Sequence, residues 1–239
     1  MTRRRRIALA LSAALLAGSI GFLRYSQVDL TLTDDDRAFA TKILAEGHVS
    51  TEQPATFEAE IELIASVQRA VIGVSPESTP IPEGTTREPA DLYRAHHGMC
   101  FDRSRTIEKI LRILGFRTRH VSAYRSVGVP VAALAIFKTG IRSHAFSEVL
   151  TRRGWMVVDS NDPFLALDQA GQPADAHRMS RDATTQSIAW DPRFAPHFIE
   201  SVYKFPFLVV YGFYSRHGRF YPPYNRVPDV NWGELTENL

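Results

Sequence analysis

The chain has little cysteine: Cys100 is the single one among 239 residues. A lone thiol forms no disulfide within its own chain, which excludes the class of small exported domains that paired cysteines hold together. It also argues against a zinc site of the usual kind, which uses several cysteine and histidine ligands at short spacing. Two readings remain for Cys100 itself, an inert buried side chain or a reactive nucleophile.

Acidic residues are missing from one part of the chain. Residues 1–24 hold five arginines and no Asp or Glu, so subtracting them from the net charge of +2 leaves −3 on the rest. A folded part without a basic excess argues against nucleic acid as a partner. The sequence also has no fixed-period repeat, and its 44% hydrophobic and 23% charged residues are typical of an ordinary globular protein.

The N-terminus is basic and then apolar. After four arginines, residues 7–23 are uncharged, and as a helix they would span about 25 Å, the short end of what crosses a bilayer. Residues 1–28 are therefore predicted to be a membrane anchor, with cleavage as a signal near residues 17–19 as the alternative. Arginines before an apolar run favour a cytoplasmic N-terminus, so residues 29–239 are predicted to lie outside the cytoplasm, in the periplasm or exported.

Hydrophobic periodicity predicts helices followed by strands. Helices are expected from residue 34 to 47, over 55–74, briefly before Gly98, and from Cys100 to Gly115. Four runs rich in β-branched and apolar residues then predict antiparallel strands: 119–127, 131–137, 144–151 and 155–160. The order of elements predicts an α+β fold, with the helix that begins at Cys100 packed on an antiparallel sheet.

Cys100 is placed at or just before the start of a helix. The reactive form of cysteine is the thiolate, and a helix N-terminus favours it because free N–H groups and the helix dipole stabilise negative charge. The same N–H groups, including that of Cys100, are potential donors to an oxyanion. The local sequence therefore favours the reactive reading.

A base and its orienting acid are expected from one hairpin. His144 begins one predicted strand, and Asp159 ends the next, with Thr151 to Gly154 between them. A two-residue loop at 151 and 152 makes His144 and Asp159 direct neighbours, whereas a four-residue loop makes them diagonal neighbours on the same face. A three-residue loop would put them on opposite faces.

Two stretches carry a family resemblance. Residues 87–121 contain Gly98, Cys100, Asp102, Leu111, Gly115, Arg119 and Val121, and residues 143–160 contain His144, Ala145, Glu148, Gly154, Trp155 and Asp159. In order and spacing, these positions resemble the transglutaminase-like superfamily of papain-type cysteine enzymes.

The resemblance implies a catalytic triad with Cys100 as nucleophile, His144 as general base and Asp159 as the residue that orients the imidazole. It implies an acyl-transfer enzyme, hydrolase, protease or transglutaminase, that acts on protein or peptide amides through a thioester, with no metal or organic cofactor. The alternative is a catalytically silent member that binds or assembles partners in the cell envelope.

Several other residues admit competing roles. His96 and His97 precede Cys100 and are expected at the surface, since a metal site lacks further ligands. Gln68 is a candidate oxyanion donor, and Asn161 or Asp162 is an alternative to Asp159. Two further residues are expected in structural roles, Arg119 paired with a buried carboxylate and Trp155 in the core or cleft.

Overall fold

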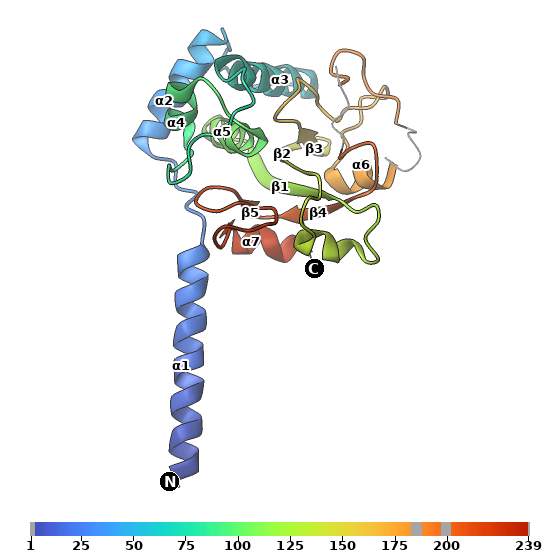
Figure 1. Ribbon diagram of the computed structural model, residues 1–239. Helices are drawn as coiled ribbons and strands as arrows, with labels where there is room; N and C mark the ends of the chain where they lie inside the picture. Colours follow the sequence, from blue (N-terminus) through green and yellow to red (C-terminus); the bar gives the residue numbers. More distant parts are fainter. Residues whose placement is uncertain (1–2, 183–187, 197–201, 239) are drawn as a thin grey trace.

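The computed structural model describes residues 3–182, 188–196 and 202–238. Figure 1 shows a body of helices and strands from which one long helix projects. The helices are α1 (Arg3–Ser26), α2 (Asp34–Glu46), α3 (Phe57–Val74), α4 (Pro89–Ala95), α5 (Cys100–Ile113), α6 (Ala176–Asp182) and α7 (Trp232–Leu235), with 3-10 turns η1 (Ala132–Phe137) and η2 (Thr236–Asn238). The strands are β1 (Arg117–Arg125), β2 (Ser143–Thr151), β3 (Gly154–Val158), β4 (Phe207–Tyr211), β5 (Phe213–Tyr214) and β6 (Asp229–Val230).

The principal sheet has four antiparallel strands in the order β3-β2-β1-β4. Helix α5 lies against β1 and β2, and α3, α2 and α4 pack on α5 from the other side. One large cluster of buried aliphatic side chains, including Ile64, Ile107 and Val149, joins α3, α5 and the sheet. The α+β arrangement predicted from the sequence, with the Cys100 helix on an antiparallel sheet, is therefore present.

The hairpin between β2 and β3 fixes the position of two predicted site residues. Thr151 pairs with Gly154, which leaves a two-residue turn at Arg152 and Arg153. This register is the one that makes His144 and Asp159 diagonal neighbours on the same face of the sheet. The two-residue turn is thus one residue later than the position, 151 and 152, that would have paired His144 directly with Asp159.

One predicted strand is wrong. Residues 132–137 form the 3-10 turn η1 rather than a strand, and among them only Ala135 is buried. The run does not show the alternation of buried and exposed side chains that a sheet position requires. It is rich in Ala and follows Pro130, a residue that disfavours a place inside a sheet. The strand predicted before it, β1, is followed directly in the sheet by β2.

Helix α5 is buried although it carries many charges. Every residue from Cys100 to Leu111 is buried, and the charged ones find partners in other parts of the chain. Burying an unpaired charge costs several kcal/mol, so each partner is required for this helix to lie in the interior. The contacts are Asp102 with Arg87, Arg103 with the carbonyl of Ser75, Arg105 with Glu88, Glu108 with His120, Lys109 with Asp36 and Glu88, and Arg112 with Glu234.

A buried polar network attaches the C-terminal segment to this helix. Glu108 Oε1 lies 2.6 Å from His120 Nδ1, and the Tyr214 hydroxyl donates to Glu108 Oε2 at 3.1 Å. The Tyr214 ring stacks on His120 with centroids 4.2 Å apart. Glu234 accepts from the His120 backbone N–H at 3.1 Å and from Arg112 at 3.2 Å. Strand β5 and helix α7 are thus held against α5 by side chains from both.

The N-terminal helix meets the C-terminal segment at its base. The Trp232 indole N–H donates to the Leu23 carbonyl at 3.2 Å, and Val28 N–H donates to the Val230 carbonyl at 2.9 Å. Beyond this contact α1 extends away from the body (Figure 1). Among the residues that the structure describes, no helix has both the length and the apolar character needed to cross a bilayer, so the predicted membrane anchor is not confirmed.

The buried carboxyl group of Glu234 makes stability depend on pH. Burial, together with the negative charge of Glu108, raises the pKa of Glu234 to about 7. Because the unfolded chain loses this proton near pH 4.5, the free energy of unfolding should fall as pH rises from about 4.5 to about 7. Glu234→Gln removes this titration. The difference in free energy of unfolding, variant minus wild type, should therefore be larger at pH 8 than at pH 5 by about 1–3 kcal/mol.

Urea titrations at both pH values measure this difference. Glu237→Gln is the matched control, because Glu237 is exposed and lies three residues further along the chain. Parallel shifts for the two variants at both pH values would contradict the assignment.

Candidate active site

Cys100 is the first residue of α5, and two neighbours fix its position. Met99 is the N-cap residue, and its backbone N–H donates to the Asp102 carboxylate at 2.9 Å. Asp102 also accepts from the Ile81 N–H at 3.3 Å, and burial raises the pKa of this carboxyl group. The N–H of Cys100 has no carbonyl one turn earlier in the helix to bond, which leaves it available as a donor.

Gly98 allows the chain to reach this position. A Cβ atom on Gly98 would lie 2.5 Å from Leu92 Cδ1 and 3.2 Å from Asp102 Cβ. Both neighbours are buried, so a larger residue would have to displace either the core or the N-terminus of α5. The requirement for glycine at position 98 is therefore steric.

His144 and Asp159 are hydrogen-bonded side by side. His144 lies near the start of β2, Asp159 follows the end of β3, and His144 Nε2 is 2.8 Å from Asp159 Oδ2. The Cys100 side chain interacts with the same imidazole, and its hydrogen bond and charge both raise the pKa of His144. All three side chains are buried, with Cys100 the most exposed at 7%.

The electrostatics of this group favour a charged imidazole. Burial is the largest effect on His144 and lowers its pKa, but the charge and hydrogen bond of Asp159, reinforced by Cys100, raise that pKa well above its ordinary value. For Asp159, burial is again the largest effect, and it raises the pKa of the carboxyl group. His144, the Tyr203 hydroxyl and the Asn161 N–H together outweigh burial and bring this pKa below its ordinary value. An imidazolium between a carboxylate and a sulfur is therefore the favoured protonation state.

The Asp159 carboxylate is fixed by four donors. Its Oδ1 accepts from the backbone N–H groups of Asn161 at 2.7 Å and Asp162 at 2.9 Å. Its Oδ2 accepts from His144 and from the Tyr203 hydroxyl, the latter at 2.5 Å. Asp159 is the residue whose side chain contacts the imidazole. The side-chain oxygen of Asn161, the alternative, instead accepts from Arg103 Nη1 at 2.8 Å. With these donors, Oδ2 is directed at the His144 ring.

Gln68 holds the loop that follows Asp159. Its amide nitrogen donates to the carbonyls of Asp159 at 2.7 Å, Asp162 at 3.0 Å and Phe164 at 2.8 Å. Because this nitrogen is used by the loop, the interpretation of Gln68 as an oxyanion donor is wrong. Its role is to tie helix α3 to the segment that carries the acid.

Tyr203 was missed by sequence reasoning. It lies in the turn before β4, is buried, and packs edge-on against the His144 ring with centroids 5.6 Å apart. No motif marks it, because it is 44 residues beyond Asp159 in an aromatic-rich stretch. Only the fold brings it to the carboxylate.

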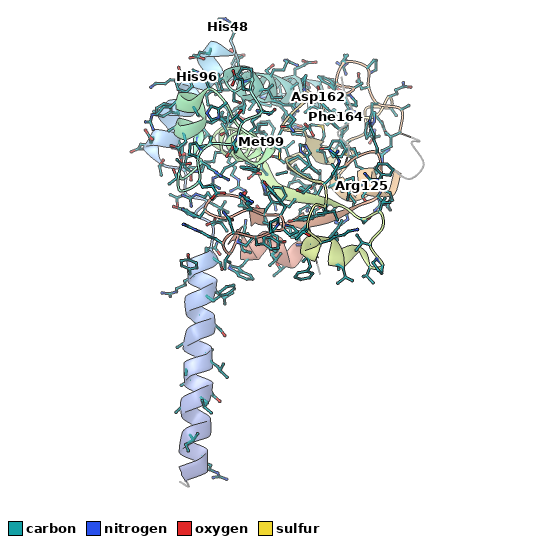
Figure 2. All side chains as sticks on the ribbon, in the orientation of Figure 1. His48, His96, Met99, Arg125, Asp162 and Phe164 are labelled. Atoms are coloured by element: carbon teal, nitrogen blue, oxygen red, sulfur yellow. The ribbon has the colours of Figure 1, made fainter. Side chains whose placement is uncertain are left out.

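The remaining predicted residues lie away from the Cys100 thiol. Arg119 pairs with the buried Glu148 across the sheet at 2.5 Å, in agreement with the prediction, and its guanidinium lies on the Trp155 ring. His97 Nδ1 lies 3.0 Å from the Thr79 carbonyl, and His96 ends α4 beside Tyr93. Figure 2 shows His96 near the edge of the body and Met99, next to Cys100, towards its centre. Within the described part of the chain, no three His, Cys, Asp or Glu residues are grouped to hold a metal ion.

Substitution of Gly98 tests the packing at the start of α5. Gly98→Ala should lower the free energy of unfolding by about 1–3 kcal/mol because the new methyl group meets Leu92 and Asp102. Gly73→Ala is the control: it lies in helix α3 with no atom within 4 Å of the added Cβ, and it should leave stability unchanged or raise it by up to about 1 kcal/mol. Chemical denaturation of both variants decides, and equal effects would refute the steric account.

Substitution of Gln68 tests the support of the acid loop. Gln68→Leu removes one donor from each of three buried carbonyls, of which those of Asp162 and Phe164 keep a backbone donor, and it should lower the free energy of unfolding by about 1–3 kcal/mol. Gln53→Leu is the matched control, since the exposed Gln53 makes one hydrogen bond, to the Leu114 carbonyl, and its loss should cost under about 0.5 kcal/mol. Urea unfolding measures both, and a Gln68→Leu protein as stable as wild type would contradict the role assigned to Gln68.

The site lies within the part of the chain that matches a known family. A search of the curated proteins finds no match to this chain. The family model of the transglutaminase-like superfamily matches residues 42–160, about half of the chain, and this range includes Cys100, His144 and Asp159. The segment from residue 42 to residue 160 therefore belongs to the transglutaminase-like superfamily, which includes cysteine enzymes.

Proposed function

We propose that this protein is a cysteine acyl-transfer enzyme that acts on protein or peptide amides through Cys100, His144 and Asp159. The observation that carries the proposal is the chain of contacts from the Cys100 thiol to the imidazole and from His144 Nε2 to the Asp159 carboxylate, 2.8 Å apart. A nucleophile, a base and an orienting acid in this order are the arrangement that covalent acyl transfer requires.

The first half of the reaction forms a thioester. With the proton on His144, the Cys100 thiolate attacks the carbonyl carbon of the amide, and the carbonyl π electrons move to oxygen. The backbone N–H of Cys100, at the start of α5, is the donor that we propose for this oxyanion. When the C–N bond breaks, His144 gives its proton to the leaving nitrogen, and the acyl group remains on sulfur.

The second half transfers the acyl group. Neutral His144 takes a proton from water or an amine, which attacks the thioester carbonyl, and the C–S bond breaks to release the thiolate. Asp159 keeps its charge throughout and stabilises the imidazolium each time it forms. We favour water over an amine as the acceptor, because water is always available and nothing in the sequence identifies an amine site. Hydrolysis of a protein or peptide substrate is thus the proposed outcome.

The proposed location follows from the N-terminal segment. Four arginines precede 17 uncharged residues. This pattern favours attachment of the N-terminal segment to a membrane, with residues 29–239 on the outer, periplasmic side. The substrate is then an envelope or exported protein.

Alkylation of Cys100 by iodoacetamide tests the proposed thiolate. Because this is the single cysteine in the chain, intact-mass spectrometry reports its reaction without ambiguity. Wild-type protein should react readily at pH 6, where an ordinary thiol is less than about 1% thiolate, and His144→Ala should slow the reaction at least about tenfold. His97→Ala is the control and should react like wild type, since His97 contacts the Thr79 carbonyl rather than the thiol.

Acylation tests the reaction itself. Wild-type protein incubated with a pool of N-blocked peptide amides and quenched in acid should show an acyl adduct on Cys100 that hydroxylamine removes as a hydroxamate. Asp159→Asn should lower adduct formation by a factor on the order of 100 or more, because the imidazolium loses its counter-charge. A protein with a reactive thiol but no adduct with any peptide would favour the silent binding module.

A further inference from the structure

An apolar surface lies beside the cluster that contains Cys100. Six large apolar side chains are more than one-third exposed, and together they form what we call the η1 face: Val127, Val131, Leu134, Phe137, Tyr224 and Val227. Phe137 is the most exposed of them, at 71%. An exposed group of this kind on a folded body marks a surface that contacts a partner or a membrane.

Hydrogen bonds join the segments that carry the η1 face. The Tyr224 hydroxyl donates to the Ile136 carbonyl at 2.7 Å, which joins the segment before β6 to the 3-10 turn η1. Beneath them, Ala135 and Phe220 pack in the same buried cluster as Cys100. The surface is therefore supported by the core and borders the proposed site.

The chain segments that form this face carry no acidic residue. Residues 109–147 and residues 201–228, which supply all of the η1 face, contain no Asp or Glu. The exposed cations in these segments include Lys138 directly after η1 and Arg226 next to Val227. The nearest carboxylates that follow in the chain are engaged: Asp229 pairs with His217, and Glu148 pairs with Arg119. Apolar side chains flanked by cations are complementary to a layer of anionic lipid headgroups.

The direction of α1 gives the same orientation. Figure 1 shows η1, the yellow-green turn beside the C-terminus, and α7 at the end of the body from which α1 projects. Helix α1 exposes Leu11, Leu15 and Leu16 along its length, and the aromatic residues Tyr25 and Trp232 lie where it joins the body. Aromatic side chains gather at the level of lipid headgroups, which suits the base of α1, and the η1 face lies at the same end of the body.

We propose that the η1 face rests on an anionic bilayer surface, with its apolar side chains among the headgroups and the body held beside α1. The buried cluster that contains Cys100 then lies beneath the lipid-facing surface, which favours substrates presented close to the lipid. This inference concerns the surface and goes beyond the proposed chemistry of Cys100.

The single cysteine allows a direct test on the full chain. In a Cys100→Ser background, Phe137→Cys carries the environment-sensitive fluorophore NBD at the η1 face. Ser50→Cys carries it on an exposed control position two residues from His48, which Figure 2 places at the opposite end of the body from α1. Vesicles contain phosphatidylcholine and phosphatidylglycerol in equal parts, with or without brominated acyl chains.

The expected result is a blue shift and stronger emission at position 137 on adding vesicles, quenching by brominated lipid, and neither change at position 50. Val131→Cys is a second reporter and should respond like position 137. Neutral phosphatidylcholine alone should give a smaller response, and an equal one would refute the role of the cations.

Two results would overturn the proposal. In the first, the protein floats with the vesicles while NBD at position 137 keeps its emission in water. In the second, the emission shifts without vesicles as protein concentration rises, which would assign the face to contact between copies of the chain. Because the labelled protein lacks Cys100, the outcome is independent of the test of the proposed acyl transfer.

Discussion

Burying the charged helix α5 is the constraint on which the rest of the molecule depends. From Cys100 to Leu111 every residue of the helix is buried, yet the helix carries acidic and basic side chains throughout. Each of these needs a partner in the interior, and the partners come from α2, the segment before α4, β1 and the segment after α3, while Arg112 in the last turn pairs with helix α7. The chain therefore wraps the helix with elements from nearly its whole length, and the first residue of that helix is the cysteine.

At the site, too, buried charges depend on their partners. A buried imidazole is ordinarily neutral, and it is the Asp159 charge that reverses this preference for His144. Asp159 in turn keeps its charge without solvent because four donors surround it, two from its own loop and two from His144 and Tyr203. The protonation of His144 is thus set by Asp159, which is itself stabilised by its own loop and by Tyr203, and the Cys100 sulfur interacts with the resulting imidazolium.

Much of this was predictable from local patterns. The start of α5 and the pairing of Arg119 follow from periodicity, capping and motif spacing, whereas the face on which His144 and Asp159 lie depends on the length of the turn after Leu150, which the sequence leaves open. Non-local contacts were out of reach: Tyr203 approaches Asp159 from 44 residues away, and Gln68 bonds the loop rather than an oxyanion. The 3-10 turn η1 was predicted as a strand because a short apolar run of Ala, Val and Ile is ambiguous without its packing partners.

The contact between Arg103 and Asn161 has a consequence for dynamics. Strand β3 is an edge of the sheet, and edge strands and the loops after them are where local opening ordinarily begins. Here the loop after β3 is bonded to α5 through Arg103 and to α3 through Gln68. Opening of this edge therefore requires separation from two core helices, so the backbone around Asp159 shares the exchange protection of the helical half rather than that of the hairpin.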